Sequence, residues 1–292
     1  MGHTEAEIAD QPAAWRRAAG SAAGAAAALP RPGERVAVVG CGTSWFAAQC
    51  YAALREAAGH GETDAFAASE APLDRPYDRL LALTRSGTTT EVLDALRHVR
   101  GRIPTVAITA DPATPVRELA GETIVLDYAD ERSVVQTRFA TTQLVLLRAH
   151  LGEDLAAAVA DAERALAAPL PDDAEQYTFL GRGWTVGLAH EAALKMREAA
   201  GAWTESYPAM EYRHGPISIA APGRVTWMFG EPPAGLADQV AAAGGTMVTG
   251  GLDPLAELIR VQRLAVRLGR ARGADPDNPR NLTRSVILGT GS

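Results

Sequence analysis

Two short glycine turns, each placed between an apolar run and a helical segment, constrain the fold of this chain most. The first turn is Gly40-Cys-Gly-Thr-Ser44 and the second is Gly181-Arg-Gly-Trp-Thr185. Further apolar runs alternate with helical segments after each turn. This β-α-β-α order predicts parallel sheets with helices on both faces. We therefore expect two α/β units of one kind, as an internal repeat within a single chain.

The apolar runs and proline breaks of the 292-residue chain give its expected organisation. We expect an N-terminal helical segment at 1–33, a first α/β domain at 34–151, a linker helix at 152–172, a shortened second domain at 173–270 and a C-terminal loop at 271–292. Strands are expected at 35–39, 64–67, 80–84, 105–109, 123–126, in a run that ends at Leu180, at 225–229 and at 246–249, and a helix at 255–268.

Charge and cysteine content exclude several kinds of partner. The net charge is −7 and no basic tract occurs, so we expect no nucleic-acid partner. The two cysteines, Cys41 and Cys50, are too few for a disulfide framework and are typical of a reducing cytosol. The sequence shows no secretory signal, no membrane-spanning apolar run and no Cys/His cluster for a metal. We therefore expect a cytoplasmic protein without a membrane partner or a cofactor.

Hydroxyl side chains gather where two expected strands of the first domain end. Thr43 and Ser44 open the helix after the first glycine turn, and an Arg-Ser-Gly-Thr-Thr-Thr run at 85–90 follows the strand at 80–84. Backbone N–H groups and hydroxyls at a helix start bind anions. The Gly-x-Gly-x-x-Gly pattern of dinucleotide sites is missing, so one phosphate group suits these loops better than a pyrophosphate. The alternative is a pair of ordinary helix caps with polar loop residues.

Acidic and basic side chains that could move protons follow the second glycine turn. Glu191, Lys195 and Glu198 are spaced i, i+4 and i+7, which places them on one face of a helix. Lys195 is the only lysine of the chain, and His214 lies in a loop closed by a Gly-Pro pair. Two carboxylates, an amine and an imidazole indicate acid–base chemistry on a small polar substrate. The alternative is an ordinary Glu–Lys pair on a helix surface.

Taken together, these motifs resemble the sugar isomerase (SIS) family. The chain is similar to proteins with two SIS domains, such as the isomerase half of glucosamine-6-phosphate synthase and the tagatose-6-phosphate ketose/aldose isomerases. The matching pieces occur in the order of the family and span nearly the whole chain. They are Gly42-Thr-Ser44, Ser86-Gly87, Thr141-Thr-Gln143, Gly181-Arg-Gly-Trp184, the helix from Glu191 through Lys195 to Glu198, His214-Gly-Pro216 and Pro279-Arg-Asn-Leu282.

The resemblance implies a fold and a role for each matching residue. Each domain is expected to be a flavodoxin-like, three-layer α/β/α unit with a parallel sheet. Glu198 matches the carboxylate that carries a proton between C1 and C2, Lys195 matches a site lysine, and His214 matches the ring-opening histidine, which the neighbouring subunit of a homodimer supplies. Arg284 takes the place of a catalytic tail lysine. The implied phosphate-binding residues are Thr43, Ser44, Thr84, Arg85, Ser86 and Thr89. The implied further substrate contacts are Gly42, Val134, Gln136 and Thr283.

Several positions depart from the synthase pattern. Arg284 stands where the synthase has a lysine, and an arginine cannot form a Schiff base at ordinary pH. Arg85 replaces a glutamine, and Gln136 replaces a serine. No glutaminase domain precedes the first unit, and Gly2 stands where the synthase has its nucleophilic cysteine. We therefore expect no glutamine-dependent amidotransfer.

The expected activity is that of a phosphosugar isomerase. The substrate would be a hexose or aminohexose 6-phosphate, and ring opening followed by proton transfer between C1 and C2 would convert the aldose to the ketose. Deamination is a further reaction that could follow the same proton transfer. One alternative is a lyase or dehydratase that acts on an N-acetylhexosamine 6-phosphate through the same enolate. An alternative of another class is a non-catalytic phosphosugar sensor, which would use the hydroxyl loops without Glu198 and His214.

Overall fold

The computed structural model describes residues 2–289, which form two compact units. Residue 1 and residues 290–292, at the outer ends of the expected N-terminal segment and C-terminal loop, lie outside the described residues. We name the units by their sheets. Within the described range, the five-strand unit comprises Ala13–Arg132, Gln136–Leu155 and residues 283–289, and the four-strand unit comprises residues 2–12, Ser133–Val135 and Ala156–Leu282.

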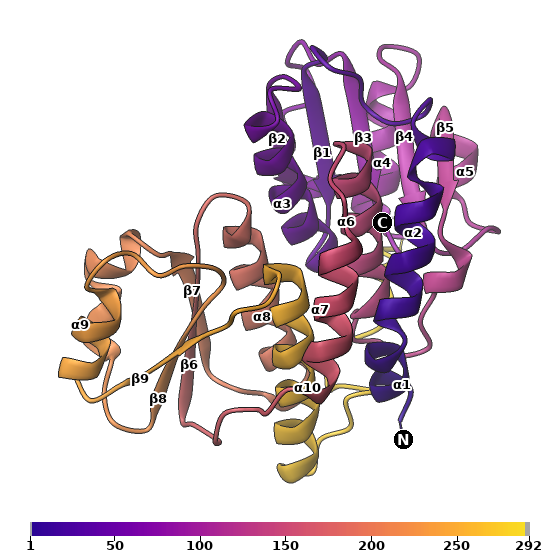
Figure 1. The fold of residues 1–292 in the computed structure, drawn as a ribbon. Helices are drawn as coiled ribbons and strands as arrows, with labels where there is room; N and C mark the ends of the chain where they lie inside the picture. Colours follow the sequence, from indigo (N-terminus) through magenta and orange to yellow (C-terminus); the bar gives the residue numbers. More distant parts are fainter. Residues whose placement is uncertain (1, 290–292) are drawn as a thin grey trace. The chain divides into compact units, whose positions relative to one another are not determined.

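The sheet of the five-strand unit is entirely parallel, as expected, and has the order β2-β1-β3-β4-β5 (Figure 1). The order 2-1-3-4-5 is that of flavodoxin-like folds. Residues of β1, β3 and β4 are buried throughout, because helices cover both faces of the sheet. The strands are β1 (Val36–Gly40), β2 (Thr63–Ala67), β3 (Arg79–Leu83), β4 (Thr105–Thr109) and β5 (Glu122–Val125).

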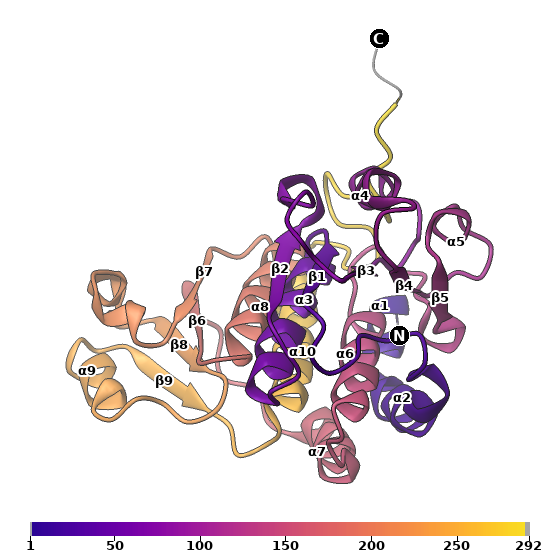
Figure 2. The ribbon, with the colours of Figure 1, turned by 90° about the horizontal axis from the view of Figure 1, so that it is seen from above.

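Helices pack on each face of this sheet. α3 (Thr43–Ala57) packs on β1 and on α6 (Arg138–His150), and Figure 2 shows α4 (Thr90–Val99) on the opposite face. α5 (Val116–Leu119) contacts α4 on that face. The indole N–H of Trp15 in α2 (Gln11–Ala25) donates to the hydroxyl of Thr141 at 2.9 Å, which fixes α2 to α6.

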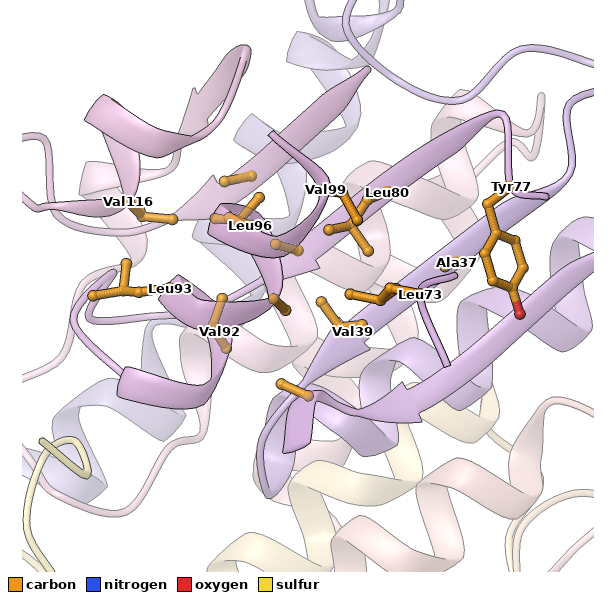
Figure 3. Close-up of a cluster of buried hydrophobic side chains, with 14 residues drawn as sticks. Ala37, Val39, Leu73, Tyr77, Leu80, Val92, Leu93, Leu96, Val99 and Val116 are labelled. Carbon is orange, nitrogen blue, oxygen red and sulfur yellow. The ribbon is translucent and has the colours of Figure 1, made fainter. Parts of the chain in front are cut away.

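The α4 face is held by an apolar cluster that Figure 3 shows in detail. Leu96 and Val99 of α4 and Val116 of α5 pack with Val39 and Leu80 from the sheet. The apolar positions of α4 recur with helical spacing, so the helix buries one face. Burying each such side chain contributes about 1.5–3 kcal/mol. The cluster therefore holds the start of α4, and with it the loop after β3, against the sheet.

The sheet of the four-strand unit is also parallel, with the order β7-β6-β8-β9. In both sheets the first strand of the unit lies between its second and third strands, and the fourth follows the third. The second sheet has one strand fewer. Its strands are β6 (Gln176–Gly181), β7 (Thr204–Pro208), β8 (Arg224–Met228) and β9 (Thr246–Thr249).

Helix α10 contacts three other helices of the four-strand unit. α10 (Pro254–Ala271) packs against α8 (Thr185–Ala200), α7 (Ala156–Ala167) and α1 (His3–Ala9), and α9 (Leu236–Ala242) covers β9. The Asp253 side chain accepts from the N–H of Leu255 at 2.9 Å and caps the start of α10. The guanidinium of Arg263 donates to the carbonyls of Ala165 and Ala168, each at 2.7 Å, and so closes the end of α7.

No helix within residues 2–289 combines the length and apolar character needed to cross a membrane. The same range contains no group of three or more His, Cys, Asp or Glu side chains placed to hold a metal ion.

Candidate functional site

The first hydroxyl pair lies where β1 runs into α3. A Cβ on Gly40 would lie 2.6 Å from the carbonyl carbon of Ser44, so only a glycine lets the helix start this close to the strand. Gly42 has φ +53° and precedes the first helical residue. Thr43 and Ser44 are both buried in the first turn of α3. Two hydroxyls in the first turn of a helix, at the positive end of its dipole, are groups that can bind an anion.

The second hydroxyl group lies in the loop between β3 and α4. Thr84 accepts from the N–H of Gly87 at 3.2 Å, and Ser86 accepts from the hydroxyl of Thr88 at 3.0 Å. A Cβ on Gly87, whose φ is +64°, would lie 2.1 Å from the hydroxyl of Thr114. Thr89 stands at the cap position of α4. The loop is thus fixed by its own hydroxyls, and its helix start can also receive an anion.

Arg85 is almost completely buried beneath this loop. Its Nη1 lies 3.4 Å from Oε2 of Glu131, and its Nη2 donates to the carbonyl of Arg284 at 3.2 Å. Burial and the nearby charge of Arg284 lower the pKa of Arg85, and the charge of Glu131 opposes that shift. The guanidinium keeps its charge at any physiological pH, since arginine has an intrinsic pKa above ~12.

Glu131 is a site residue that sequence reasoning missed. Its Oε1 accepts from the N–H groups of Thr137 and Arg138, at 2.6 and 2.7 Å, and so caps the start of α6. Its Oε2 faces Arg85. One carboxylate therefore fixes both a helix start and the buried arginine of the second loop. The only sequence signal was an acidic residue six positions before a Thr-Arg pair.

The described part of the tail bonds to the same loop. Arg284 donates to the carbonyl of Glu131 and pairs with the carboxylate of Asp130. The hydroxyls of Ser285 and Thr88 are 3.0 Å apart, and the N–H of Thr90 donates to the carbonyl of Val286 at 3.2 Å. Tail residues thus bond to the start of α4 within the five-strand unit.

The charged triad of the four-strand unit lies on α8. A Cβ on Gly181 would lie 2.2 Å from the carbonyl oxygen of Thr185, so α8, like α3, starts against the end of its strand. Nζ of Lys195 is 3.4 Å from Oε1 of Glu191 and forms a closer ion pair with Glu198. The Lys195 side chain is only 1% exposed. The interpretation as an ordinary surface pair is therefore wrong.

A cavity of about 550 Å³ opens beside Glu198 within the four-strand unit. It lies between the end of α8 and the segment that follows α10. Its size is within the range of small-molecule sites, roughly 300–1,000 Å³. Its charged lining residues are Arg197, Glu198, Arg272, Asp275 and Arg280, and its amide side chains belong to Asn278 and Asn281.

The expected site residues fall into two groups, one in each unit. His214 is exposed after a 3₁₀ turn at Glu211–Arg213 and is not among the residues that line the 550 Å³ cavity. The five-strand unit holds Gly42, Thr43, Ser44, Thr84, Arg85, Ser86, Thr89, Gln136, Thr283 and Arg284. The four-strand unit holds Val134, Lys195, Glu198 and His214.

Sequence comparisons relate this chain to glutamine–fructose-6-phosphate aminotransferases. No family model matches the chain. The glutamine–fructose-6-phosphate aminotransferase (isomerizing) of Bradyrhizobium diazoefficiens is 28% identical over 317 aligned positions, which cover 87% of this chain and 52% of that protein. The enzyme of the same name from Aeropyrum pernix is 30% identical over 266 positions, covering 72% and 43%. The chain spans about half the length of the curated relatives it matches.

Solved structures share the fold over nearly the whole chain. Glucosamine-6-phosphate deaminase from Thermotoga maritima superposes with a TM-score of 0.82 at 23% identity, covering 98% of this chain and 100% of that one. Tagatose-6-phosphate ketose/aldose isomerase from Escherichia coli gives a TM-score of 0.77 at 18% identity, covering 99% and 98%. The C-terminal domain of the Francisella tularensis aminotransferase also gives 0.77, at 21% identity, covering 95% and 98%. At these identities the likeness establishes the fold.

Proposed function

We propose that this chain, whose homologues and structural neighbours are sugar isomerase (SIS) domain proteins, is a phosphosugar isomerase acting on a hexose or aminohexose 6-phosphate. The observation that carries the proposal is the arrangement of Glu198. Its carboxylate pairs with a buried lysine and lines a cavity of about 550 Å³. A carboxylate held in this way can remove a proton from a carbon next to a carbonyl.

The proposed chemistry moves one proton between neighbouring carbons. Glu198 takes the proton from the carbon beside the carbonyl, and the resulting enediol accepts it back on the adjacent carbon. Lys195 fixes the carboxylate in position through its ion pair. His214, supplied by the partner copy in a homodimer, would open the sugar ring. With a 2-amino sugar, the same proton transfer leads to loss of ammonia.

The phosphate group of the substrate would bind to the hydroxyl loops of the five-strand unit. Support comes from two helix starts, each with a buried hydroxyl and each next to the end of a parallel strand. Ligands of open α/β sheets bind at these strand ends. The buried guanidinium of Arg85 lies under the second loop and would favour a dianion only by the part of its charge that Glu131 does not offset.

The remaining proposals concern the internal repeat of the chain and its cellular compartment. We infer that the two units are copies of one SIS unit, because their sheets share a strand order and each has a helix packed against a glycine at the end of its first strand. Neither Cys41 nor Cys50 forms a disulfide within residues 2–289, which fits a protein of the reducing cytoplasm. The expected domain limits at 34–151 and 173–270 stay predictions.

Solvent exchange of substrate hydrogens tests the proposal. The protein is incubated in heavy water with a panel of hexose and hexosamine 6-phosphates, and deuterium at C1 or C2 is measured by NMR. We expect exchange with at least one sugar, and a loss of about 10²–10⁴-fold in Glu198→Gln, because a general base contributes that much. Glu118→Gln, which alters an exposed carboxylate of α5, is the matched control and should exchange at the parent rate.

Two outcomes would count against the isomerase. Binding of a sugar phosphate without any exchange would indicate a sensor. Exchange at the parent rate in Glu198→Gln would show that another group is the base. The same spectra identify an isomer, ammonia loss or a dehydrated product.

A further inference from the structure

Proton removal by Glu198 creates a charge that the protein must stabilise. This inference rests on the proposed function. When the proton moves to Glu198, the C–H electron pair forms a carbon–carbon double bond and the carbonyl oxygen takes a negative charge. Enzymes stabilise such an oxygen with a donor or cation fixed in advance. A donor or a cation on the wall of the same cavity would supply this stabilisation.

The basic residues expected from sequence are either paired already or lie outside this cavity. Lys195 is buried and paired with both Glu191 and Glu198. Arg284 pairs with Asp130 and belongs to the five-strand unit. His214 does not line the cavity beside Glu198. Arg284 and His214 thus do not line that cavity, and the charge of Lys195 is already shared between two carboxylates.

Arg280 lies on the wall of this cavity together with Glu198. Its guanidinium forms no hydrogen bond or ion pair with any residue between 2 and 289, the range that the structure describes. The two other arginines of the cavity are engaged differently. Arg272 donates to the carbonyl of Ala200 at 3.0 Å, and Arg197 donates to the hydroxyl of Thr204 at 3.1 Å. Arg280 therefore has all its donors available to a ligand.

The backbone that carries Arg280 is fixed by specific contacts. Asn281, the next residue, has φ +62° and is the one non-glycine residue in the described range with a left-handed backbone. The Asp277 carboxylate accepts from the N–H and the hydroxyl of Thr4, at 2.7 and 2.6 Å, and the Asp277 carbonyl accepts from Val134 at 3.1 Å. A free guanidinium on a fixed, left-handed turn beside the proposed base indicates a ligand contact.

We propose that Arg280 is a further catalytic residue, whose guanidinium binds the oxygen that becomes negative when Glu198 removes the proton. Guanidinium N–H groups can donate in parallel to two neighbouring oxygens. An enediolate presents two such oxygens on adjacent carbons. Arg280 would therefore bind the intermediate better than the neutral open-chain sugar, and that difference accelerates the reaction.

Arg280→Ala, Arg280→Lys and the control Arg100→Ala test this role. Arg100 is an exposed arginine at the end of α4 in the other unit, so its replacement makes the same change in net charge. We expect kcat for deuterium exchange to fall about 10²–10³-fold in Arg280→Ala, the cost of losing an oxyanion donor, with KM little changed. Arg280→Lys should retain part of the rate, since it keeps the charge without the planar fork.

Chemical rescue separates catalysis from folding. Low concentrations of guanidinium chloride, below those that affect the parent, should restore exchange in Arg280→Ala. A sugar-phosphate titration of the same variant reports whether the phosphate loops still bind.

Three results would overturn the inference. Parent-like exchange in Arg280→Ala would do so while leaving the isomerase intact. A loss that guanidinium does not restore, with weakened sugar-phosphate binding, would assign Arg280 a structural role. A parent protein that exchanges no hydrogen on any sugar phosphate would remove the proposed function and this inference together.

Discussion

At the residue scale, Cys41 shows how the end of a buried strand alters a side chain. The thiol follows β1 directly, at the first hydroxyl turn. Burial, together with the negative charge of Glu91, raises the pKa of Cys41 to about 11, against the lowering effect of a hydrogen bond from the Ala68 backbone. The thiol is therefore protonated throughout the physiological range, and the nucleophilic thiolate is scarce.

Thiol labelling against pH checks this property. Because the pKa of Cys41 is about 11, the thiolate fraction should rise about tenfold per pH unit from pH 7 to 10. Alkylation by iodoacetamide should be far slower than that of a free thiol of pKa ~8.5 at pH 8. Cys41→Ala provides the background from Cys50, which is only 1% exposed. A labelling rate that levels off near pH 9 would contradict the raised pKa.

Site residues differed in how far the sequence could reveal them. The sequence indicated that Ser44 and Ser86 lie between an apolar run and a helix, and the structure has Ser44 in the first turn of α3 and Ser86 in the loop before α4. Glu131 and Arg280 were not assigned roles. The contact of Glu131 with Arg85 joins residues 46 positions apart. The lack of a partner for the Arg280 guanidinium within residues 2–289 depends on which residues surround it in the fold. Short-range spacing predicts the first kind of residue and cannot predict the second.

At the scale of elements, close contact between a strand end and a helix start fixes both glycine turns. Gly181→Ala would place a Cβ 2.2 Å from the carbonyl oxygen of Thr185. The backbone must shift, and overpacking of this kind costs about 1–3 kcal/mol. We expect the free energy of unfolding, measured by urea denaturation with circular dichroism, to fall by that amount.

The matched control for this substitution is a glycine at which an added Cβ would have no close neighbour. Gly20 is exposed within α2, and a Cβ there would meet no atom within 4 Å. Gly20→Ala should raise stability by roughly 0.5–1 kcal/mol, because alanine is the better helix former. Equal effects of the two substitutions would show that the contact at Gly181 is not restrictive.

Elements were predictable where apolar runs marked them. The strand at Thr105–Thr109 and the strand at Thr246–Thr249 have the expected bounds, and α10 extends the expected helix at both ends. β7 was missed. Its sequence, Thr-Glu-Ser-Tyr-Pro, has no apolar run, and its residues are half-buried or exposed at an edge of the sheet. Pairing with β6 makes it a strand, and such pairing is not visible in local sequence.

At the scale of the whole molecule, each unit draws on distant parts of the chain. Glu7 of α1 accepts from the hydroxyl of Ser133, 126 positions away, and Thr4 bonds to Asp277, 273 positions away. These contacts place residues 2–12 and 133–135 in the four-strand unit. Neither assignment could be predicted from composition, because both depend on contacts between remote segments.

A single cut in the loop between α7 and β6 should therefore release no free fragment. We propose inserting a protease site between Asp172 and Asp173, in this loop. α7 precedes the cut and packs on α10, which follows it, so the four-strand unit has elements on both sides. The cut halves should co-elute on size exclusion and separate only in denaturant. Separate elution without denaturant would contradict this interleaved arrangement.

The reactivity of Lys195 toward acylating reagents would report the opening of α8. It is the only lysine, and its amine is sealed between two carboxylates on α8. Acylating reagents therefore find no exposed lysine while that helix stays closed. Acylation of Lys195 would require α8 to open. The rate of Lys195 acylation, measured by mass spectrometry, would therefore report how often the proposed catalytic helix opens.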